Sequence, residues 1–267
     1  MPRKGGFIVF EGIDGSGLST HSKLLMGWLE KKGYPVFWTD EPTGGPIGSL
    51  IRLILEGHTD IENRQDILAL LFAADRIWHI KQYRFDRRDR RKKGIENAIR
   101  EGNIVICNRY LLSSLAYQSG PPPPPSNENL GSAELSERHS LDMGWVDSVN
   151  HPLNSERVVV EPDLVIFLDV PPEESMKRII KGNRTYELYE DYGAAAEVHK
   201  RYYEAMEKYR HWTTFRIKGF KNGRARSIES VQAEIQDKVR EFVLREEPRK
   251  EKKQLLPEET IDYHATS

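Results

Sequence analysis

The chain has 267 residues, of which 38% are hydrophobic and 30% are charged, and its formal net charge is -1. This length allows one large domain or two small ones with a sizeable core, and the near-neutral charge excludes nucleic-acid binding through a general excess of basic residues. No apolar run is long enough to span a membrane, and the apolar part of the N-terminal stretch is too short for a signal peptide. We expect a globular protein with no nucleic-acid and no membrane partner.

Short apolar runs alternate with helical segments along the chain. Residues 6–11 (GFIVFE) are rich in β-branched and aromatic residues, which predicts a strand buried on both faces, and residues 18–33 follow as a helix. The apolar face of this helix is predicted to contain Leu24, Leu25, Trp28 and Leu29. Further strands are predicted over residues 34–40, 103–108, 163–169 and 212–218.

Longer helices are predicted between and after these strands. They cover residues 64–83, 195–209 and 227–244, and the register of the first buries Leu68, Leu71 and Phe72. Strands that alternate with helices predict a parallel sheet with right-handed crossovers and helices on both faces. The expected fold class is therefore α/β.

The only cysteine is Cys107, so no intrachain disulfide is expected. This usage is typical of a reducing setting, and we expect a cytoplasmic protein. Cys107 ends the apolar run NIVIC, which favours a buried strand residue over a reactive thiol.

Three stretches interrupt the alternation. Residues 83–93 are strongly basic but also contain acidic residues, which favours a solvated helical extension over a nucleic-acid patch. Residues 120–140 include five successive prolines, which predict a stiff surface loop; a ligand for a proline-binding module is the alternative. The tail after residue 245 is charged and poor in apolar residues, so we expect it to be frayed or disordered.

The segment GIDGSGLST (12–20) follows the first predicted strand and begins the first predicted helix. It matches the phosphate-binding pattern G-x-x-x-x-G-K-[ST] at Gly12, Gly17 and Ser19, but Leu18 replaces the lysine. Glycines let backbone N–H groups point inward, and the helix N-terminus adds partial positive charge, so most of the phosphate cradle survives this change. Ser19 can place a hydroxyl on magnesium. The expected ATP contacts are Gly12, Ile13, Asp14, Gly15, Ser16, Gly17, Leu18, Ser19 and Thr20.

Five segments resemble, in the same order, the motifs of the thymidylate kinase family. They are FEGIDGSGLST (10–20), DEPTGGPIG (40–48), LLFAADR (70–76), NRYLLSSLAYQ (108–118) and EPDLVIFLDVPPEESMKR (161–178). The combination of FAADR with RYLLSSLAYQ is the specific part, because a phosphate-binding loop alone does not name a substrate. The resemblance runs from residue 7 to about residue 245.

The resemblance implies a nucleoside-monophosphate-kinase-like fold with a five-stranded parallel sheet. The kinase-like domain is expected over residues 1–245, with a lid at about 181–192 and insertions at about 84–93 and 121–140. Residues 246–267 form the charged tail. Members of this family are usually homodimers, which the resemblance extends to this chain.

The implied reaction is transfer of the γ-phosphate of ATP to thymidine monophosphate (dTMP), giving dTDP for dTTP biosynthesis, with Mg²⁺ bound at Ser19. The implied catalytic residues are Asp14, Arg109 and Arg184. Arg109 can clamp the acceptor phosphate with a bidentate fork, and Asp14 is the acidic residue of the loop, near the attacking phosphate. Arg184 lies in the lid, from which family members present an arginine to the phosphates.

The resemblance also implies an acceptor site. Its residues are Glu41, Phe72, Arg76, Arg109, Ser114, Tyr117 and Gln118. Phe72 and Arg76 are four residues apart on one helix, so they share a face on which thymine can stack and accept a hydrogen bond. The counterparts of Ser114 and Gln118 help fix the base, and that of Tyr117 crowds the sugar 2′ position. Glu41 matches a carboxylate reached through metal-bound water.

Three positions depart from the family pattern: Leu18 replaces lysine, Asn108 replaces aspartate, and Asp40 stands where arginine is frequent. Leu18 and Asn108 remove one cation and one anion from a single site, so we treat them as a compensated pair. Independent loss in a decaying site is the alternative. Arg184 is the preferred replacement for the missing cation.

Two other cations near the loop are Lys181 and Lys23. Lys23 is the weaker replacement, because family members also carry a lysine at that position beside the usual one. Two other functions remain open: a nucleotide-binding regulatory homologue that no longer catalyses, and a kinase for another deoxynucleoside or monophosphate.

Overall fold

The computed structural model describes residues 5–59, 64–82, 94–121, 140–151, 159–181, 192–221 and 223–244. The basic insertion, most of the proline-rich insertion, most of the lid and the charged tail lie outside the described residues. Arg184 lies outside them as well. The expectations for these segments therefore stay predictions.

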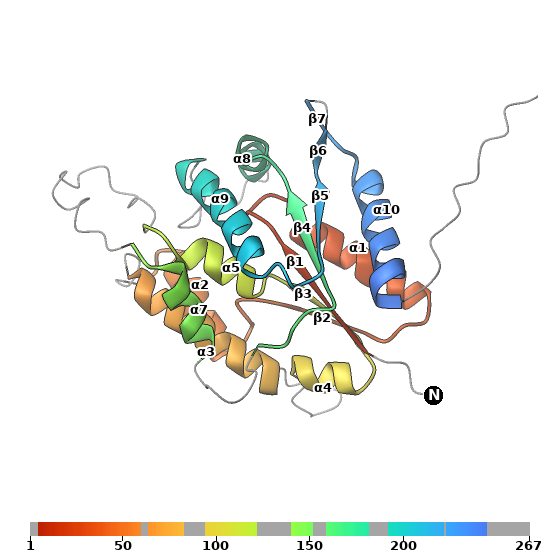
Figure 1. Ribbon diagram of the computed structural model, residues 1–267, viewed down its shortest axis with the longest axis horizontal. Helices are drawn as coiled ribbons and strands as arrows, with labels where there is room; N and C mark the ends of the chain where they lie inside the picture. Colours follow the sequence, from red (N-terminus) through yellow and green to blue (C-terminus); the bar gives the residue numbers. More distant parts are fainter. Residues whose placement is uncertain are drawn as a thin grey trace, which may run out of the picture.

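A five-stranded parallel sheet with strand order β2-β3-β1-β4-β5 forms the centre of the protein (Figure 1). The strands are β1 (Gly6–Glu11), β2 (Val36–Asp40), β3 (Ile104–Asn108), β4 (Leu164–Asp169) and β5 (Thr214–Lys218). Phe10 of β1 and Asp40 of β2 both pair with Asn108 of β3, so the carboxyl ends of three strands meet at one edge. The predicted α/β fold is confirmed.

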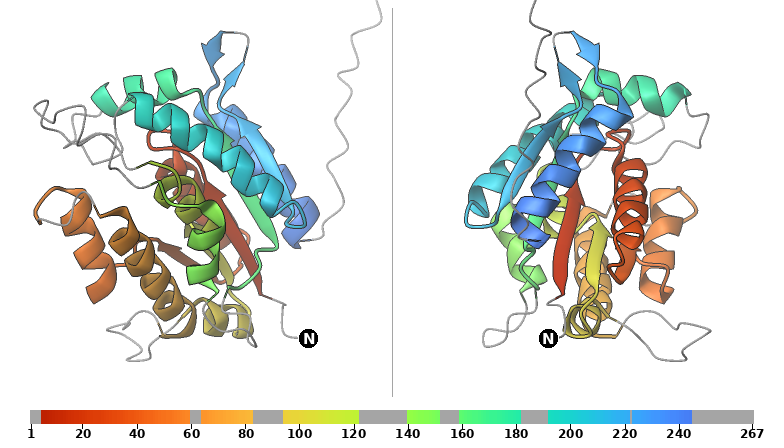
Figure 2. Two further views of the ribbon diagram at one scale, coloured as in Figure 1. Left: turned by 60° about the vertical axis from the view of Figure 1, so that its left-hand side comes forward. Right: turned by 90° about the vertical axis from the view of Figure 1, so that its right-hand side faces the viewer.

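Helices cover both faces of this sheet (Figures 1 and 2). They are α1 (Leu18–Lys31), α2 (Pro46–Leu55), α3 (Gln65–Gln82), α4 (Ile95–Arg100), α5 (Leu111–Gln118), α7 (Met143–Asn150), α8 (Pro172–Lys181), α9 (Tyr192–Lys208) and α10 (Ile228–Val239), which a π-helical turn extends over Arg240–Leu244. Phe7 and Val9 of β1 pack with α5 and α9 on one face of the sheet. Ile8 and Phe10 pack with α1 and α10 on the other face, as expected for a strand buried on both sides.

The first predicted helix is present as α1, but its buried face differs from the prediction. The buried residues are Leu18, His21, Ser22, Leu25 and Leu29. Leu24 is 43% exposed, so its assignment to the apolar face is wrong. It precedes Leu25 by one residue, which turns its side chain about 100° away from the face that packs on the sheet.

Helix α3 confirms the predicted long helix over its central residues. Leu68 is fully buried in a cluster with Ile51 and Ile54 of α2. Leu71 and Phe72 are partly buried against this cluster, so the predicted burial is complete for Leu68 and partial for the other two residues.

Several short elements were not predicted. They are α2, α4, α5, α7, α8 and a hairpin of β6 (Phe220–Lys221) and β7 (Arg224–Ala225). These helices have 6 to 10 residues and therefore fewer than three turns, which is too few for a clear apolar period. The hairpin strands have two residues each, so they show no alternation at all.

Cys107 lies in β3 and is a free, fully buried thiol. Burial raises its pKa well above the usual value. Its interpretation as a buried strand residue is confirmed.

Candidate active site

The loop between β1 and α1 has the backbone conformation that its glycines predict. Gly12, Gly15 and Gly17 have φ angles of 152°, 74° and 103°, in the region that favours glycine. A Cβ atom on Gly15 would lie 2.6 Å from the backbone oxygen of Ser175 in α8. The loop therefore curls tightly and packs directly against α8.

A cavity of about 690 Å³ lies in front of this loop, at the carboxyl edge of the sheet. Residues 13–20 line it, together with the strand ends at Asp40, Asn108 and Leu168 and with parts of α8, β7 and α10. Helix α1 begins at Leu18, so its amino-terminal N–H groups border the cavity. Such a helix end favours a bound anion. We call this space the larger cavity.

A second cavity of about 100 Å³ lies between α2, α3 and α5. It is lined by Asp14, Glu41, Pro42, Leu55, Phe72, Arg76, Arg109, Tyr110, Ser113, Ser114, Tyr117 and Gln118. The structure thus brings together all seven residues that the sequence assigns to an acceptor site, although they come from three separate segments. We call this space the smaller cavity.

The two cavities share part of their walls. Asp14, Glu41, Pro42 and Arg109 line both. A ligand in one cavity therefore lies next to a ligand in the other, and these four residues mark the border.

Arg109 is fixed at this border by Asp14 and Tyr117. Its Nη2 lies 2.7 Å from Oδ1 of Asp14, and Tyr117 donates from its hydroxyl to Oδ2 of Asp14 at 2.7 Å. The Arg109 guanidinium carbon also lies 4.8 Å from the centre of the Tyr117 ring. Burial opposes the charged form, but the adjacent Asp14 carboxylate raises the pKa of Arg109 well above its usual value. Arg109 is therefore a permanent cation between the two cavities.

Glu11 is linked to Arg109 through the Tyr202 hydroxyl. Glu11 was not identified as a site residue from the sequence. Its Oε1 accepts hydrogen bonds from the backbone N–H groups of Tyr110 at 3.0 Å and Ser113 at 3.3 Å. Its Oε2 accepts from the Tyr202 hydroxyl at 3.3 Å, and Tyr202 in turn accepts from Nη1 of Arg109 at 3.1 Å. Burial raises the pKa of Glu11. These contacts hold the start of α5 against β1.

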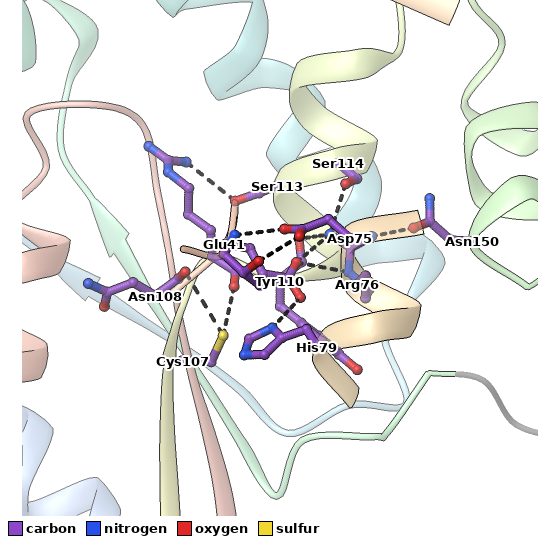
Figure 3. Close-up of polar contacts among 12 residues, drawn as sticks. Glu41, Asp75, Arg76, His79, Cys107, Asn108, Tyr110, Ser113, Ser114 and Asn150 are labelled. Atoms are coloured by element: carbon purple, nitrogen blue, oxygen red, sulfur yellow. Dashed lines mark hydrogen bonds and ion pairs between the residues drawn. The ribbon is translucent and has the colours of Figure 1, made fainter. Parts of the chain in front are cut away.

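Arg76 is buried, with 2% of its surface exposed, and holds four polar partners (Figure 3). Its Nε and Nη2 donate to the same oxygen of Glu41 at 3.0 and 2.7 Å. Nη2 also donates to the hydroxyl of Ser114 at 2.9 Å, and Nη1 donates to the side-chain oxygen of Asn150. Tyr110 contributes its backbone oxygen. This network fixes the guanidinium in the wall of the smaller cavity.

His79 and Asn150 complete the network, and sequence reasoning missed both. His79 is fully buried, with Nδ1 3.0 Å from Oε1 of Glu41 and Nε2 2.7 Å from the hydroxyl of Thr39. Asn150 ends α7, a helix that the sequence did not predict. The available signal for His79 was its position three residues after Arg76, on the same side of α3.

The three departures from the family pattern all line the larger cavity. Leu18 is 8% exposed and packs in the core cluster beneath α1, and Asp40 borders the same space. The side-chain oxygen of Asn108 is buried without a hydrogen-bond partner among the described residues. An unpartnered buried oxygen is costly unless a ligand or water satisfies it.

The two described lysines suggested as replacements do not line the larger cavity. Lys23 places its Nζ 5.6 Å from the centre of the Trp38 ring, and Lys181 is exposed at the end of α8.

The basic residues that line the larger cavity are arginines: Arg52, Arg109, Arg178 and Arg226. Arg178 is bound through its Nε to Glu174 at 2.9 Å. Burial lowers the pKa of His21, which also lines the cavity.

A parallel sheet with a glycine-rich loop before its first helix, and two adjoining cavities at its carboxyl edge, define a nucleotide kinase of the P-loop class. The model of one family, described as thymidylate kinase, matches residues 10–122 and 132–235. The chain belongs to the thymidylate kinase family, whose members phosphorylate dTMP with ATP.

Several curated relatives are similar to this chain and are named as probable thymidylate kinases. A "Probable thymidylate kinase" from Pyrococcus horikoshii is 40% identical over 186 residues, which cover 68% of this chain and 74% of the relative. One from Thermococcus gammatolerans is 41% identical over 181 residues, covering 66% of this chain and 70% of the relative. One from Methanocaldococcus jannaschii is 36% identical over 203 residues, covering 76% and 82%.

None of the described helices combines the length and the apolar composition that a membrane span requires.

Proposed function

We propose that this chain transfers the γ-phosphate of ATP to dTMP, with ATP in the larger cavity and dTMP in the smaller one. The observation that carries this assignment is the shared border, where Asp14 and Arg109 line both cavities. Phosphoryl transfer requires an in-line approach of the two nucleotides and charge stabilisation at their meeting point. Arg109 supplies that charge.

The smaller cavity has the groups that thymine and its sugar phosphate require. Phe72 offers a half-buried aromatic face for stacking, and Arg76 holds a fixed guanidinium in the cavity wall, to which a base oxygen can bind. Gln118 has a buried side-chain oxygen without a partner among the described residues, which suits a base N–H. Ser114 helps orient Arg76, and Tyr117 closes the side next to the sugar.

Mg²⁺ is the proposed metal, held chiefly by the ATP phosphates and water. The described residues contain no group of three or more His, Cys, Asp or Glu side chains that could form a metal cage. Mg²⁺ needs none, because it is usually bound by one or two protein oxygens and substrate phosphates. The exposed Ser19 hydroxyl and the unpartnered oxygen of Asn108 are the protein groups that suit this role, and the ion would neutralise phosphate charge.

A homodimer and a cytoplasmic location complete the proposal. Leu50 and Leu53 of α2 and Leu70 of α3 are exposed apolar residues on two helices that pack together. Such residues suit an interface between two copies of the chain. Light scattering should report a dimer, and Leu53→Glu should shift it towards monomer.

The free, buried thiol of Cys107 accords with a reducing compartment, and cell fractionation tests the cytoplasmic location.

A coupled assay of ATP consumption by the purified chain, across the nucleoside monophosphates, tests the function. We expect the highest kcat/KM with dTMP. Preferential turnover of a different monophosphate would reassign the acceptor. ATP binding with no turnover of any monophosphate would indicate a nucleotide-binding regulator instead.

A further inference from the structure

His21 lies on the first turns of α1 and shares a wall of the larger cavity with Leu18. The two residues are three positions apart, so their side chains project from the same side of the helix. Both are nearly buried, with 8% of Leu18 and 6% of His21 exposed. The loop therefore lacks a lysine at one position but has a polar ring at a neighbouring one.

Gln232 of α10 fixes the protonation of this ring. The amide group satisfies its surroundings when its nitrogen faces His21, because that nitrogen then donates to Nδ1 at 3.0 Å and to the backbone oxygen of His21 at 3.3 Å. The amide oxygen then accepts from the backbone N–H of Leu25 at 3.2 Å. Nδ1 is thus an acceptor, which places the proton of the neutral imidazole on Nε2.

The Nε2 edge of the ring faces the phosphate-binding loop. A Cβ atom on Gly17 would lie 3.3 Å from Cδ2 and 3.8 Å from Nε2 of His21. Within the part of the chain that the structure describes, no group pairs with Nε2. An N–H donor therefore stands beside the loop with its hydrogen bond unused.

We propose that Nε2–H of His21 donates a hydrogen bond to a phosphate oxygen of ATP and supplies a donor in place of the lysine that Leu18 replaces. This inference rests on the proposed placement of ATP in the larger cavity. A neutral imidazole replaces the donor of a lysine but not its charge. The positive charge that lines this cavity comes from arginines, such as Arg178, which also lines the wall near His21.

The rival explanation is that His21 only joins α1 to α10 through Gln232. Two substitutions separate these roles. His21→Asn keeps an acceptor near the position of Nδ1 and can preserve the bond to Gln232, but it removes the donor at Nε2. His21→Gln places an amide N–H near the position of Nε2 and gives up the Nδ1 acceptor.

Calorimetric titration of the full chain with ATP and, separately, with dTMP tests the proposal. We expect His21→Asn to weaken ATP binding about ten-fold or more, as loss of a hydrogen bond to a charged group does. His21→Gln should stay within about three-fold of the unmodified chain. Binding of dTMP should not change in either variant. Lys23→Ala is the matched control, because Lys23 lies on the same helix over Trp38 and outside the cavity.

If His21→Asn keeps its ATP affinity and His21→Gln loses it, the proposal is wrong, and His21 only links α1 to α10 through Gln232. If both variants bind ATP with the affinity of the unmodified chain, His21 does not contact a phosphate. If the unmodified chain binds no ATP, the proposed function fails and this inference fails with it, whereas a failure of the inference alone leaves ATP binding intact.

Nuclear magnetic resonance of the unmodified chain gives a second test that needs no variant. We expect the Nε2–H signal of His21 to move downfield when ATP is added and not when dTMP is added. An unchanged signal at ATP saturation would overturn the proposal, even if His21→Asn does not fold.

Discussion

Asp14 and Arg109 form an ion pair, with 2.7 Å between Oδ1 and Nη2, at the border between the two cavities. Asp14 comes from the phosphate-binding loop, and Arg109 directly follows β3. Arg109 has a φ of 64°, which a non-glycine residue rarely adopts, and its backbone N–H donates to the oxygen of Phe10 at 2.8 Å. A residue held in this conformation by its surroundings is typical of a functional position.

Replacement of Arg109 should impair both binding and turnover. In the proposed arrangement, Arg109 is a fixed cation that contacts the acceptor phosphate in the ground state and in the transition state, and Arg109→Ala removes it. We expect a higher KM for dTMP and a kcat lower by about 100-fold. Steady-state kinetics measures both constants. Arg210→Ala is the control, because Arg210 is exposed and pairs only loosely with Glu207, at 3.7 Å. An Arg109→Ala enzyme with the kinetics of this control would remove Arg109 from the site.

The buried pair between Glu41 and Arg76 should dominate local stability. Glu41→Gln keeps the shape of the side chain but leaves Arg76 as a buried charge without its carboxylate. We expect the free energy of unfolding to fall by about 3 kcal/mol, measured by urea denaturation. The matched control is Glu207→Gln, which breaks an exposed pair and should cost less than about 1 kcal/mol. Equal losses in the two variants would mean that Arg76 is not held by Glu41.

Leu18 and Asn108 should behave as a coupled pair. Both line the larger cavity, and together they remove one positive and one negative group from it. Leu18→Lys and Asn108→Asp should therefore each disturb the charge balance, while the double variant restores it. We expect a coupling energy of at least about 0.5 kcal/mol in ATP affinity and in turnover. Strict additivity in both would favour two independent losses in a decaying site.

Arg184, in the predicted lid, should act mainly on the chemical step. A lid arginine reaches the phosphates only when the lid closes, so Arg184→Ala should lower kcat by about 100-fold and change ATP affinity little. Lys181→Ala is the control, because Lys181 is exposed and does not line the larger cavity. Unchanged kcat in the Arg184 variant would remove this residue from the mechanism.

The sequence predicted the framework of the fold because the framework depends on local patterns. Each of the five strands is a short apolar run, and each was placed within two residues of its observed ends. The glycines at 12, 15 and 17 predicted the tight loop because their role depends on their own backbone angles. The same reasoning failed for Leu24, which was predicted to share a buried face with Leu25. Adjacent residues on a helix point in different directions, and Leu24 is exposed.

The contacts that organise the site were not predictable in this way, because they join distant parts of the chain. Arg76 and Asn150 are 74 positions apart, and His21 and Gln232 are 211 positions apart. No periodicity in the sequence indicates such pairs. The seven residues that the resemblance assigns to an acceptor site line one cavity. The resemblance gave no role to Glu11, which binds the backbone of Tyr110, or to His79, which contacts Glu41.

A molecule that joins adenosine and thymidine through a chain of phosphates between their 5′ oxygens tests the two-cavity arrangement most directly. If the cavities adjoin at Asp14 and Arg109, this molecule should occupy both. We predict competitive inhibition against ATP and against dTMP, with an affinity about 100-fold or more above that of either nucleotide alone. Competition with only one of the two substrates, at the affinity of a single nucleotide, would contradict the arrangement.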